Sequence, residues 1–182
     1  MSQNKIIALV GMCGTGKSVV CDLFCEKGFN KIYFGQVTMD ELKARGLQKN
    51  EQNERMVREE LRRVHGPAAF AKLLLPSIEK AQDEGDTILD GLYSWSEYKC
   101  LKEHFGDRLI VAAVITNRPI RYERLTTRKI RPLTNEEALS RDLAEIEKLE
   151  KGGPIAMADY FILNNGDVES LCAQVDEFLS NI

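Results

Sequence analysis

The fold class follows from the stretch Gly11-Met12-Cys13-Gly14-Thr15-Gly16-Lys17-Ser18, near the start of a chain of 182 residues. An apolar run at residues 6–10 precedes it and apolar positions at 19–24 follow, so we expect a strand before it and a helix after it. Its three glycines let the backbone wrap inward, so that successive N–H groups and the positive helix N-terminus point at one spot. The spacing predicts a phosphate-binding loop; the alternative is a plain glycine-rich turn.

The side chains of this loop suit the same chemistry. Lys17 is placed to reach β- and γ-phosphates, and the Ser18 hydroxyl is a ligand for Mg²⁺. The residues that we expect to bind ATP here are Gly11, Cys13, Gly14, Thr15, Gly16, Lys17, Ser18 and Val19. An electropositive loop could also make the Cys13 thiol sensitive to oxidation, but we favour an inert small residue at that position.

Composition places the chain among ordinary globular proteins. With 43% hydrophobic and 29% charged residues, it fits one α/β domain over 1–182. No apolar run approaches the roughly 20 residues of a membrane span, and no signal-peptide core precedes the first strand, so we expect a soluble cytoplasmic monomer or homodimer. A net charge of −3 without a basic tail argues against nucleic-acid or membrane partners. Five cysteines without paired spacing indicate reduced thiols.

Periodicity and turn residues outline the remaining elements. We predict a short buried strand at 31–34, helices at 36–45, 51–65 and 68–82, a strand within 86–91, a helix from 94 to about 104, a strand at 108–115, helices after 117 and after 134, a strand at 158–163 and a helix at 167–179. Pro67 suits the first turn of the third of these helices. Ser94-x-x-Glu97 and Thr134-x-x-Glu137 have the spacing of capping boxes for the helices that follow them. Because strands and helices alternate, right-handed crossovers give about five parallel strands with helices on both faces, and the strand at 108–115 is the best candidate for the centre.

Asp90 stands where the predicted strand of Asp86-Thr87-Ile88-Leu89-Asp90-Gly91 ends. In parallel sheets, ligands bind beyond the carboxyl ends of the strands, so Asp90 would lie beside the phosphate loop. There its carboxylate could hold Mg²⁺, directly or through water. The alternative is an aspartate that caps a turn.

Two segments carry clustered arginines. The predicted helix at 51–65 has an apolar face and an opposite cationic face; these are Met56, Val57, Leu61 and Val64, and Arg55, Arg58, Arg62 and Arg63. Further along the chain lie Arg118, Arg121, Arg124, Arg128, Arg131 and Arg141. The second segment is either a solvated helical hairpin or a mobile lid whose guanidinium groups neutralise phosphates. We favour the lid because it is cationic in a chain that is acidic overall.

Several stretches together resemble a known group of enzymes. They are the phosphate loop, Gly35-Gln36-Val37, Leu61-Arg62-Arg63-Val64-His65-Gly66-Pro67, Leu89-Asp90-Gly91, Arg121-Tyr122-Glu123-Arg124-Leu125-x-x-Arg128, Arg141-Asp142 and Ala158-Asp159-Tyr160-Phe161-Ile162-Leu163-Asn164. Through them the chain resembles the small P-loop kinases, which include nucleoside monophosphate kinases and dephospho-CoA kinases. It looks most similar to an uncharacterised kinase-like, AAA-type ATPase family of archaea and bacteria.

The resemblance implies a three-layer P-loop NTPase fold with ATP and Mg²⁺ as cofactors. It divides the chain into a core (1–35, 86–118 and 154–182), an acceptor-side helical insertion (36–85) and a lid (119–153). By similarity to adenylate kinases, Arg124 would lie against the adenine, and Asn164 and Gly166 would lie along the base. The residues expected to act on the phosphates in catalysis are Lys17, Arg128, Arg131 and Arg141.

The departures from these families fall on the acceptor side. Monophosphate kinases have an arginine after the second strand and another after the Asp-Gly pair, whereas this chain has Gln36 and then Met39 at the first place and Leu92-Tyr93-Ser94 at the second. Dephospho-CoA kinases carry an aspartate where Gln36 stands. The resemblance therefore does not indicate that this chain uses the acceptor of either family.

The sequence thus predicts an ATP-dependent phosphotransferase that acts on a nucleotide or a nucleotide-like small molecule. Gly35, Arg58, Arg62 and Tyr93 are the candidate acceptor-binding residues, and Ser18 and Asp90 are the candidate metal ligands. A dephospho-CoA kinase-like enzyme and a nucleotide-binding ATPase or switch without a small-molecule acceptor remain alternatives, and the choice between ATP and GTP stays open.

Overall fold

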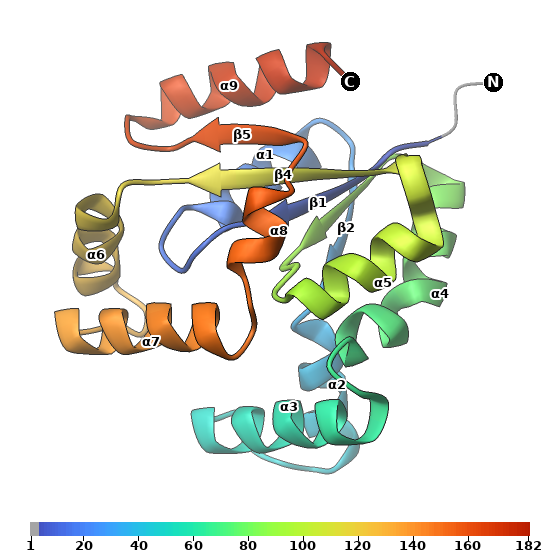
Figure 1. The fold of residues 1–182 in the computed structure, drawn as a ribbon, viewed down its shortest axis with the longest axis vertical. Helices are drawn as coiled ribbons and strands as arrows, with labels where there is room; N and C mark the ends of the chain where they lie inside the picture. The colour runs from blue at the N-terminus through green and yellow to red at the C-terminus, as the bar shows by residue number, and fades with distance from the viewer. Residues whose placement is uncertain (1–3) are drawn as a thin grey trace.

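Strands and helices alternate along residues 4–182, the part of the chain that the computed structural model describes (Figure 1). The elements are β1 (Ile6–Val10), α1 (Lys17–Glu26), β2 (Asn30–Tyr33), α2 (Gln36–Ala44), α3 (Glu51–His65), α4 (Ala69–Glu84), β3 (Thr87–Asp90), α5 (Trp95–Phe105), the 3-10 turn η1 (Gly106–Arg108), β4 (Leu109–Ile115), α6 (Arg118–Thr127), α7 (Asn135–Glu147), α8 (Gly152–Ala156), β5 (Tyr160–Leu163) and α9 (Val168–Ser180). The prediction missed α8, because a five-residue helix that begins Gly-Gly-Pro shows no helical periodicity.

The strands form one five-stranded parallel sheet in the order β2-β3-β1-β4-β5. The predicted three-layer α/β fold is therefore confirmed. β4 is an interior strand, but the middle position belongs to β1, whose five residues are all buried. The loop that follows β1 consequently leaves the sheet at the centre of its carboxyl edge, where ligands bind in folds of this kind.

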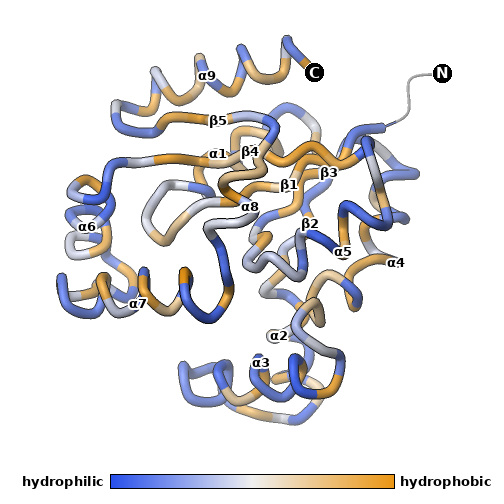
Figure 2. Tube along the Cα trace, viewed as in Figure 1, coloured by the Kyte–Doolittle hydropathy of each residue, from blue (hydrophilic) through white to orange (hydrophobic). Residues whose placement is uncertain are grey.

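Alternate residues of β1 face two different layers of helices. Ile6, Ala8 and Val10 pack with apolar residues of α4 and α5, while Ile7 and Leu9 pack with those of α1 and α9. Figure 2 shows the resulting pattern, with hydrophobic segments along the central strands and a largely hydrophilic α3 at the periphery. A strand that is buried on both faces reads as a continuous apolar run, which is why β1 and β4 were easy to predict.

Side-chain caps fix several helix starts. Ser94 and Glu97 form the predicted capping box of α5, and Thr134 and Glu137 form that of α7. Each cap satisfies backbone N–H groups that have no partner inside the helix and contributes on the order of 1 kcal/mol.

Three local predictions were wrong. β2 is an edge strand and alternates between half-buried and exposed residues, so it is not a buried strand. Met56 and Val64 are 44% and 60% exposed, because α3 packs only against α2 and α4 and needs a narrower apolar stripe. Pro67 lies before α4 rather than in its first turn, since that helix begins at Ala69.

The segment between β2 and β3 has two parts. α4 belongs to the core, where Ala71 and Ile78 are fully buried with residues of β1 and β3. α2 and α3 lie farther out, and together they carry the predicted acceptor side (Figure 1). Within residues 4–182, no helix combines the length and the apolar character that crossing a membrane requires.

Candidate phosphate-binding site

The loop at residues 11–18 depends on a glycine at its end. Gly16 precedes α1 with φ +88°, in the left-handed region, and a Cβ there would lie 2.3 Å from Nδ2 of Asn164. An L side chain would meet both the torsional cost and this clash, so the close approach needs glycine.

Residues from the far ends of β4 and β5 support the loop from the sheet side. Asn164 donates from Nδ2 to the Thr15 carbonyl at 2.9 Å, and the Thr116 hydroxyl reaches the same oxygen at 3.2 Å. Thr15 in turn donates from Oγ1 to the Met12 carbonyl at 3.0 Å. All three supporting residues are buried, so the loop is held from below before any ligand acts on it.

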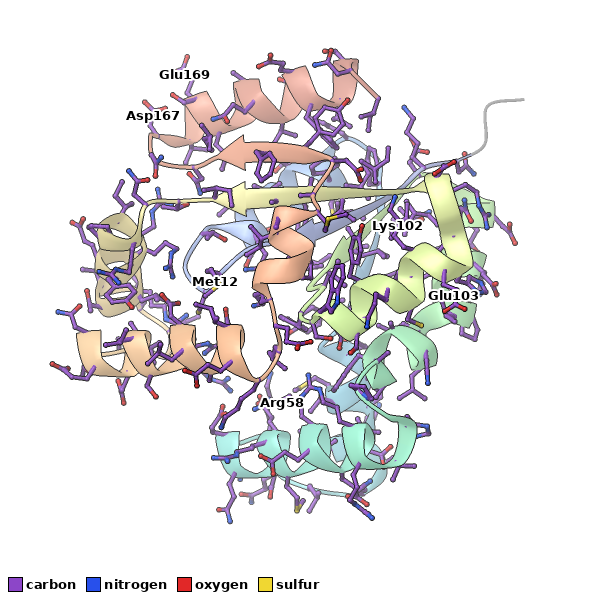
Figure 3. The ribbon with its side chains drawn as sticks, in the orientation of Figure 1. Met12, Arg58, Lys102, Glu103, Asp167 and Glu169 are labelled. Carbon is purple, nitrogen blue, oxygen red and sulfur yellow. The ribbon has the colours of Figure 1, made fainter. Side chains whose placement is uncertain are left out.

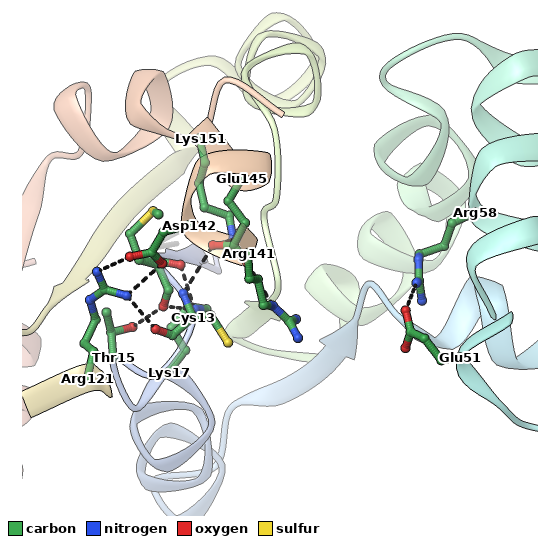
Figure 4. Close-up of polar contacts among 12 residues, drawn as sticks. Cys13, Thr15, Lys17, Glu51, Arg58, Arg121, Arg141, Asp142, Glu145 and Lys151 are labelled. Carbon is green, nitrogen blue, oxygen red and sulfur yellow. Dashed lines mark hydrogen bonds and ion pairs between the residues drawn. The ribbon is translucent and has the colours of Figure 1, made fainter. Parts of the chain in front are cut away.

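A buried ion pair supports the opposite side of the loop (Figure 4). Arg121 of α6 donates from Nη1 to the Cys13 carbonyl at 2.9 Å and binds the Asp142 carboxylate of α7 through both Nη atoms, at 2.9 and 2.7 Å. The two side chains are only 7% and 8% exposed. This bidentate pair joins the predicted lid hairpin to the loop.

Lys17 is held by the loop itself. Its Nζ donates to the Gly11 carbonyl at 2.7 Å and to the Met12 carbonyl at 3.0 Å. The pKa of Lys17 is lowered to about 8, mainly by burial and next by the nearby positive charge of Lys151, while the carboxylates of Glu145 and Asp90 oppose the shift. The ammonium is therefore poorly solvated where it stands, which favours an anionic partner.

Glu145 of α7 reaches the loop from the lid hairpin. Its Oε2 accepts from the Cys13 backbone N–H at 3.2 Å and from Lys151 Nζ at 2.9 Å. Its Oε1 lies 3.6 Å from Nε of Arg141. Figure 4 shows these four residues gathered above the loop, while Arg58 and Glu51 lie apart from them on α3.

The two candidate metal ligands lie on neighbouring elements. Asp90 ends β3 opposite Leu9 of β1, and its side chain is 14% exposed. Its Oδ2 lies 3.4 Å from Nζ of Lys31. Ser18 is exposed in the first turn of α1. A hydroxyl and a carboxylate are oxygen donors of the kind that Mg²⁺ prefers, so the chemistry of this pair fits the ion.

Some of the residues predicted to act from the lid, or to contact the nucleotide base, lie at the loop, and others lie away from it. Arg141 is at the loop through Glu145, and Arg124 lies beneath it, with Nη2 3.5 Å from Oδ1 of Asn164. Arg128 donates to the Arg131 carbonyl within the turn between α6 and α7, and Gly166 is exposed beyond β5.

Asn164 has a supporting place. Its side chain donates to Thr15, its backbone N–H donates to Ile115, and its carbonyl accepts from Thr116. With these groups engaged inside the protein, Asn164 holds the loop, and its predicted contact with the base would need it to change partners.

The predicted acceptor residues lie in three places, and two of them, Arg58 and Arg62, are on α3. Arg58 pairs with Glu51 at 3.0 Å and with Glu54 at 3.4 Å, both on its own helix (Figure 3). Arg62 lies 4.9 Å from the centre of the Phe70 ring, and its Nε has no hydrogen-bond partner among the described residues.

The other two acceptor candidates are Gly35, which lies against an aromatic ring, and Tyr93, whose ring lies against a cation. Gly35 begins α2 under the ring of Tyr33, which a Cβ would approach to 2.3 Å. Tyr93 follows β3, and its ring centre is 5.2 Å from Nζ of Lys151. Burial raises the pKa of the Tyr93 hydroxyl, so that group stays protonated.

Sequence reasoning missed four residues of this site: Arg121, Asp142, Glu145 and Lys151. Arg121 and Asp142 stood in stretches that carry the family resemblance, and Arg121 was also one of the clustered arginines, but neither was given a role. The four-residue step from Arg141 to Glu145 was a visible helical pair, but nothing in it pointed to the loop. A lysine in an unpredicted connection is normally solvated, so no local signal marked Lys151 as buried.

Fold and loop together define a protein with a P-loop kinase-like fold. Solved structures with this architecture include TT1252 from Thermus thermophilus (TM-score 0.61, 20% identity, 100% of this chain and 99% of that one) and shikimate kinase from Bacteroides thetaiotaomicron (0.61, 16%, 97% of each). Dephospho-CoA kinase from Campylobacter jejuni is a third (0.54, 16%, 99% and 98%). At these identities the likeness concerns the fold.

The sequence comparisons are more specific. A family model described as an AAA domain matches residues 7–156. The UPF0200 protein of Sulfurisphaera tokodaii is 34% identical, covering 100% of this chain and 99% of that protein, and the one of Aeropyrum pernix is 37% identical, covering 93% and 90%. The chain belongs to this AAA domain family and, within it, to the UPF0200 proteins.

Proposed function

We propose that this protein is an ATP-dependent phosphotransferase that acts on a nucleotide or a nucleotide-like small molecule. The observation that carries the proposal is the loop at residues 11–18, whose shape is fixed from two sides by buried partners, Asn164 below and the Arg121–Asp142 pair beside it. A rigid loop with inward backbone N–H groups and the poorly solvated Lys17 suits the β- and γ-phosphates of ATP.

Ser18 and Asp90 are the residues that would hold Mg²⁺, which supplies charge neutralisation to the phosphates when bound. The Asp90 side chain is 14% exposed, and Nζ of Lys31 lies 3.4 Å from its Oδ2. An ionised carboxylate has several acceptor sites, so Asp90 can keep this contact and still accept a ligand.

Transfer itself depends mainly on positioning and charge. The transition state of phosphoryl transfer is loose and metaphosphate-like, so a catalytic carboxylate is not required. Lys17 and Arg141 are already at the loop. Arg128 and Arg131 would have to leave their present partners to act there, as arginines of a closing lid do.

Support for a small-molecule acceptor comes from the site and from the related structures. Two of these are, by name, kinases of shikimate and of dephospho-CoA. In this chain, Tyr93 follows the end of β3 and has Lys151 over its ring, and Arg62 on α3 lies over the ring of Phe70. An acceptor with an anionic or aromatic part suits such a set.

One observation favours a second candidate, an ATPase or nucleotide-dependent switch. Arg58, the outermost of the acceptor candidates, is neutralised by Glu51 and Glu54 of its own helix. A paired guanidinium is less available to an acceptor phosphate than a free one, and the arginines that monophosphate kinases carry after the second strand and after the Asp-Gly pair are absent here.

Turnover measurements separate the two candidates. ADP formation from MgATP is measured with and without nucleoside monophosphates, nucleosides, shikimate, dephospho-CoA and pantetheine, and the products are identified by mass spectrometry. We expect one class of acceptor to raise ADP formation at least tenfold, with an equal amount of phosphorylated product. Lys17→Ala should abolish the activity, whereas the exposed Lys49→Ala should not change it. ADP formation that no acceptor changes would favour the ATPase.

A further inference from the structure

Lys151 is unusual among the lysines of the described chain because it is only 1% exposed. It precedes α8, and its ammonium has a carboxylate partner, Glu145, at 2.9 Å and the Tyr93 ring on another side, 5.2 Å from the ring centre. A buried ammonium is costly unless it is paired, so a buried lysine at the edge of a ligand site needs an explanation.

The Glu145 carboxylate is bound as a phosphate oxygen would be bound. Its Oε2 accepts both from the backbone N–H of Cys13, in the middle of the loop, and from the Lys151 ammonium. Its second oxygen faces the guanidinium of Arg141. A loop amide, a lysine and a lid arginine around one anion form a set of donors typical of phosphate sites.

The charges of the region also require an anion. The positive charge of Lys151 lies close enough to Lys17 to contribute to the lowered pKa of Lys17. Glu145 and Asp90 offset part of this charge, but Arg141 adds a further cation beside Glu145. A polyphosphate carries more negative charge than one carboxylate and would be preferred between the two lysines.

The position of Lys151 indicates which phosphate it would contact. On one side it reaches, through Glu145, the Cys13 amide of the loop; on the other it touches Tyr93, which follows β3 on the acceptor side. A group between these two points lies toward the acceptor, so it corresponds to the terminal phosphoryl group and not to the phosphates nearer the adenosine.

We propose that Lys151 is a second phosphate-binding lysine, which contacts the transferable γ-phosphoryl group, and that Glu145 occupies this position until the phosphoryl group displaces it. The proposal rests on the proposed function, since it assumes that the loop binds ATP. Glu145 then competes with the γ-phosphate of ATP for the same donors. ADP has no γ-phosphate, so ADP can bind without displacing Glu145.

Binding measurements with the full chain test this. Dissociation constants are measured by calorimetry with Mg²⁺ for ADP and for the β,γ-imido analogue of ATP. Lys151→Met should weaken binding of the ATP analogue about tenfold and that of ADP less than twofold. Glu145→Gln should tighten binding of the analogue by about tenfold and leave ADP nearly unchanged, because an amide competes less well for the loop N–H and the two cations.

The controls are Lys148→Met and Glu147→Gln, which remove the same charges from exposed positions nearby and should leave both constants unchanged. Thermal unfolding adds a second readout. Glu145→Gln leaves Lys151 buried without its counterion, so this variant should melt at a lower temperature and gain more from the ATP analogue than the parent protein does.

The outcomes are distinct. If Lys151→Met weakens ADP and the analogue equally, Lys151 is only structural and the proposal fails. If Glu145→Gln weakens binding of the analogue, Glu145 is a ligand of the site and not a competitor, and the proposal also fails. If the parent protein binds neither nucleotide, or binds as well with Lys17→Ala, the proposed function itself is wrong. If Lys151→Met does not fold, Glu145→Gln alone decides.

Discussion

The loop after β1 and the cationic face of α3 both present positive groups, yet they are built in opposite ways. The loop takes its shape from side chains that come from other parts of the chain and are buried, such as Asn164 and the pair Arg121–Asp142. On α3, Arg58 is paired with Glu51 and Glu54 of the same helix, and Glu51 is 73% exposed. The loop is fixed by the tertiary fold, whereas Arg58 is neutralised within its own helix, although the buried Glu54 also pairs with Arg131 of the turn between α6 and α7.

This difference has a consequence for how the loop and the cationic face of α3 can act in the proposed function. A buried, bidentate ion pair fixes geometry, because removing one partner leaves an uncompensated charge inside the protein. An exposed pair on one helix contributes little to stability and exchanges partners at little cost. We infer that the phosphate-donor side is preorganised, whereas the acceptor side can rearrange around what it binds.

The largest effect should come from breaking the buried pair. Asp142→Asn leaves Arg121 without its counterion, so we expect the free energy of unfolding to fall by about 3–5 kcal/mol. Urea denaturation measures this. The matched change on the acceptor side, Glu51→Gln, should cost less than about 0.5 kcal/mol. Equal effects of the two variants would contradict the contrast between the regions.

A second test separates the loop's shape from its charge. Gly16→Ala adds a Cβ 2.3 Å from Nδ2 of Asn164 at φ +88°, so it should destabilise the protein by about 2–3 kcal/mol and greatly weaken ATP binding. Gly28→Ala is the control, because Gly28 has φ +91° but no atom within 4 Å of its Cβ position among the described residues. It should cost only the torsional strain, about 1 kcal/mol, with ATP binding unchanged. Similar binding losses would show that strain alone explains the effect.

The same contrast explains what could be predicted from sequence. Some features depend only on residues that are close together in the sequence, and these were predicted correctly. They are the turn from β1 into α1, the capping boxes at Ser94 and Thr134, and the extent of α3. The partnership of Arg121 with Asp142 spans 21 positions and depends on how α6 and α7 pack, so single-sequence patterns do not contain it.

Other misses have the same origin. Met56 and Val64 fit a helical apolar face, but whether that face is covered depends on tertiary packing, and it is covered only at Val57 and Leu61. Lys151 directly precedes α8, which was not predicted. Its buried ammonium lies against Glu145 and the ring of Tyr93, which are distant in sequence or on other elements. Local chemistry predicted the donor loop, whereas long-range packing supplied its supports.

Glu97 lies between the two regions and gives them a shared pH dependence. It is fully buried, and burial raises its pKa to about 7, although the backbone N–H groups of Tyr93 and Ser94 and the charges of Arg62 and Lys151 oppose the rise. In the unfolded chain the same carboxyl has its ordinary pKa of about 4.5. Between these two values the folded protein binds more protons than the unfolded chain does.

The free energy of unfolding should therefore fall as pH rises from about 4.5 to about 7, and this contribution should be constant above pH 7. We expect a loss on the order of 2 kcal/mol over that window, measured by urea denaturation at several pH values. Glu97→Gln keeps an oxygen acceptor for the two N–H groups and should remove this part of the slope. Glu103→Gln, an exposed position on the same helix, should leave it (Figure 3). An unchanged slope in Glu97→Gln would show that other groups cause it.

The smallest effect concerns the one ion pair described between the lid turn and α3. Nη2 of Arg131 lies 3.2 Å from Oε1 of Glu54, and the arginine side chain is 56% exposed. An exposed guanidinium exchanges this carboxylate for water at little cost, and Glu54 retains Arg58 as a partner.

A double-mutant cycle with Arg131→Gln and Glu54→Gln should therefore give a coupling energy of about 0.5 kcal/mol in urea denaturation. A coupling above about 2 kcal/mol would mean that the lid turn and α3 form one rigid unit. In that case Arg131 could not swing to the loop during transfer, and the acceptor side would be as preorganised as the donor side. A weak coupling leaves both the arginine and α3 able to move, as an acceptor site assembled around its ligand requires.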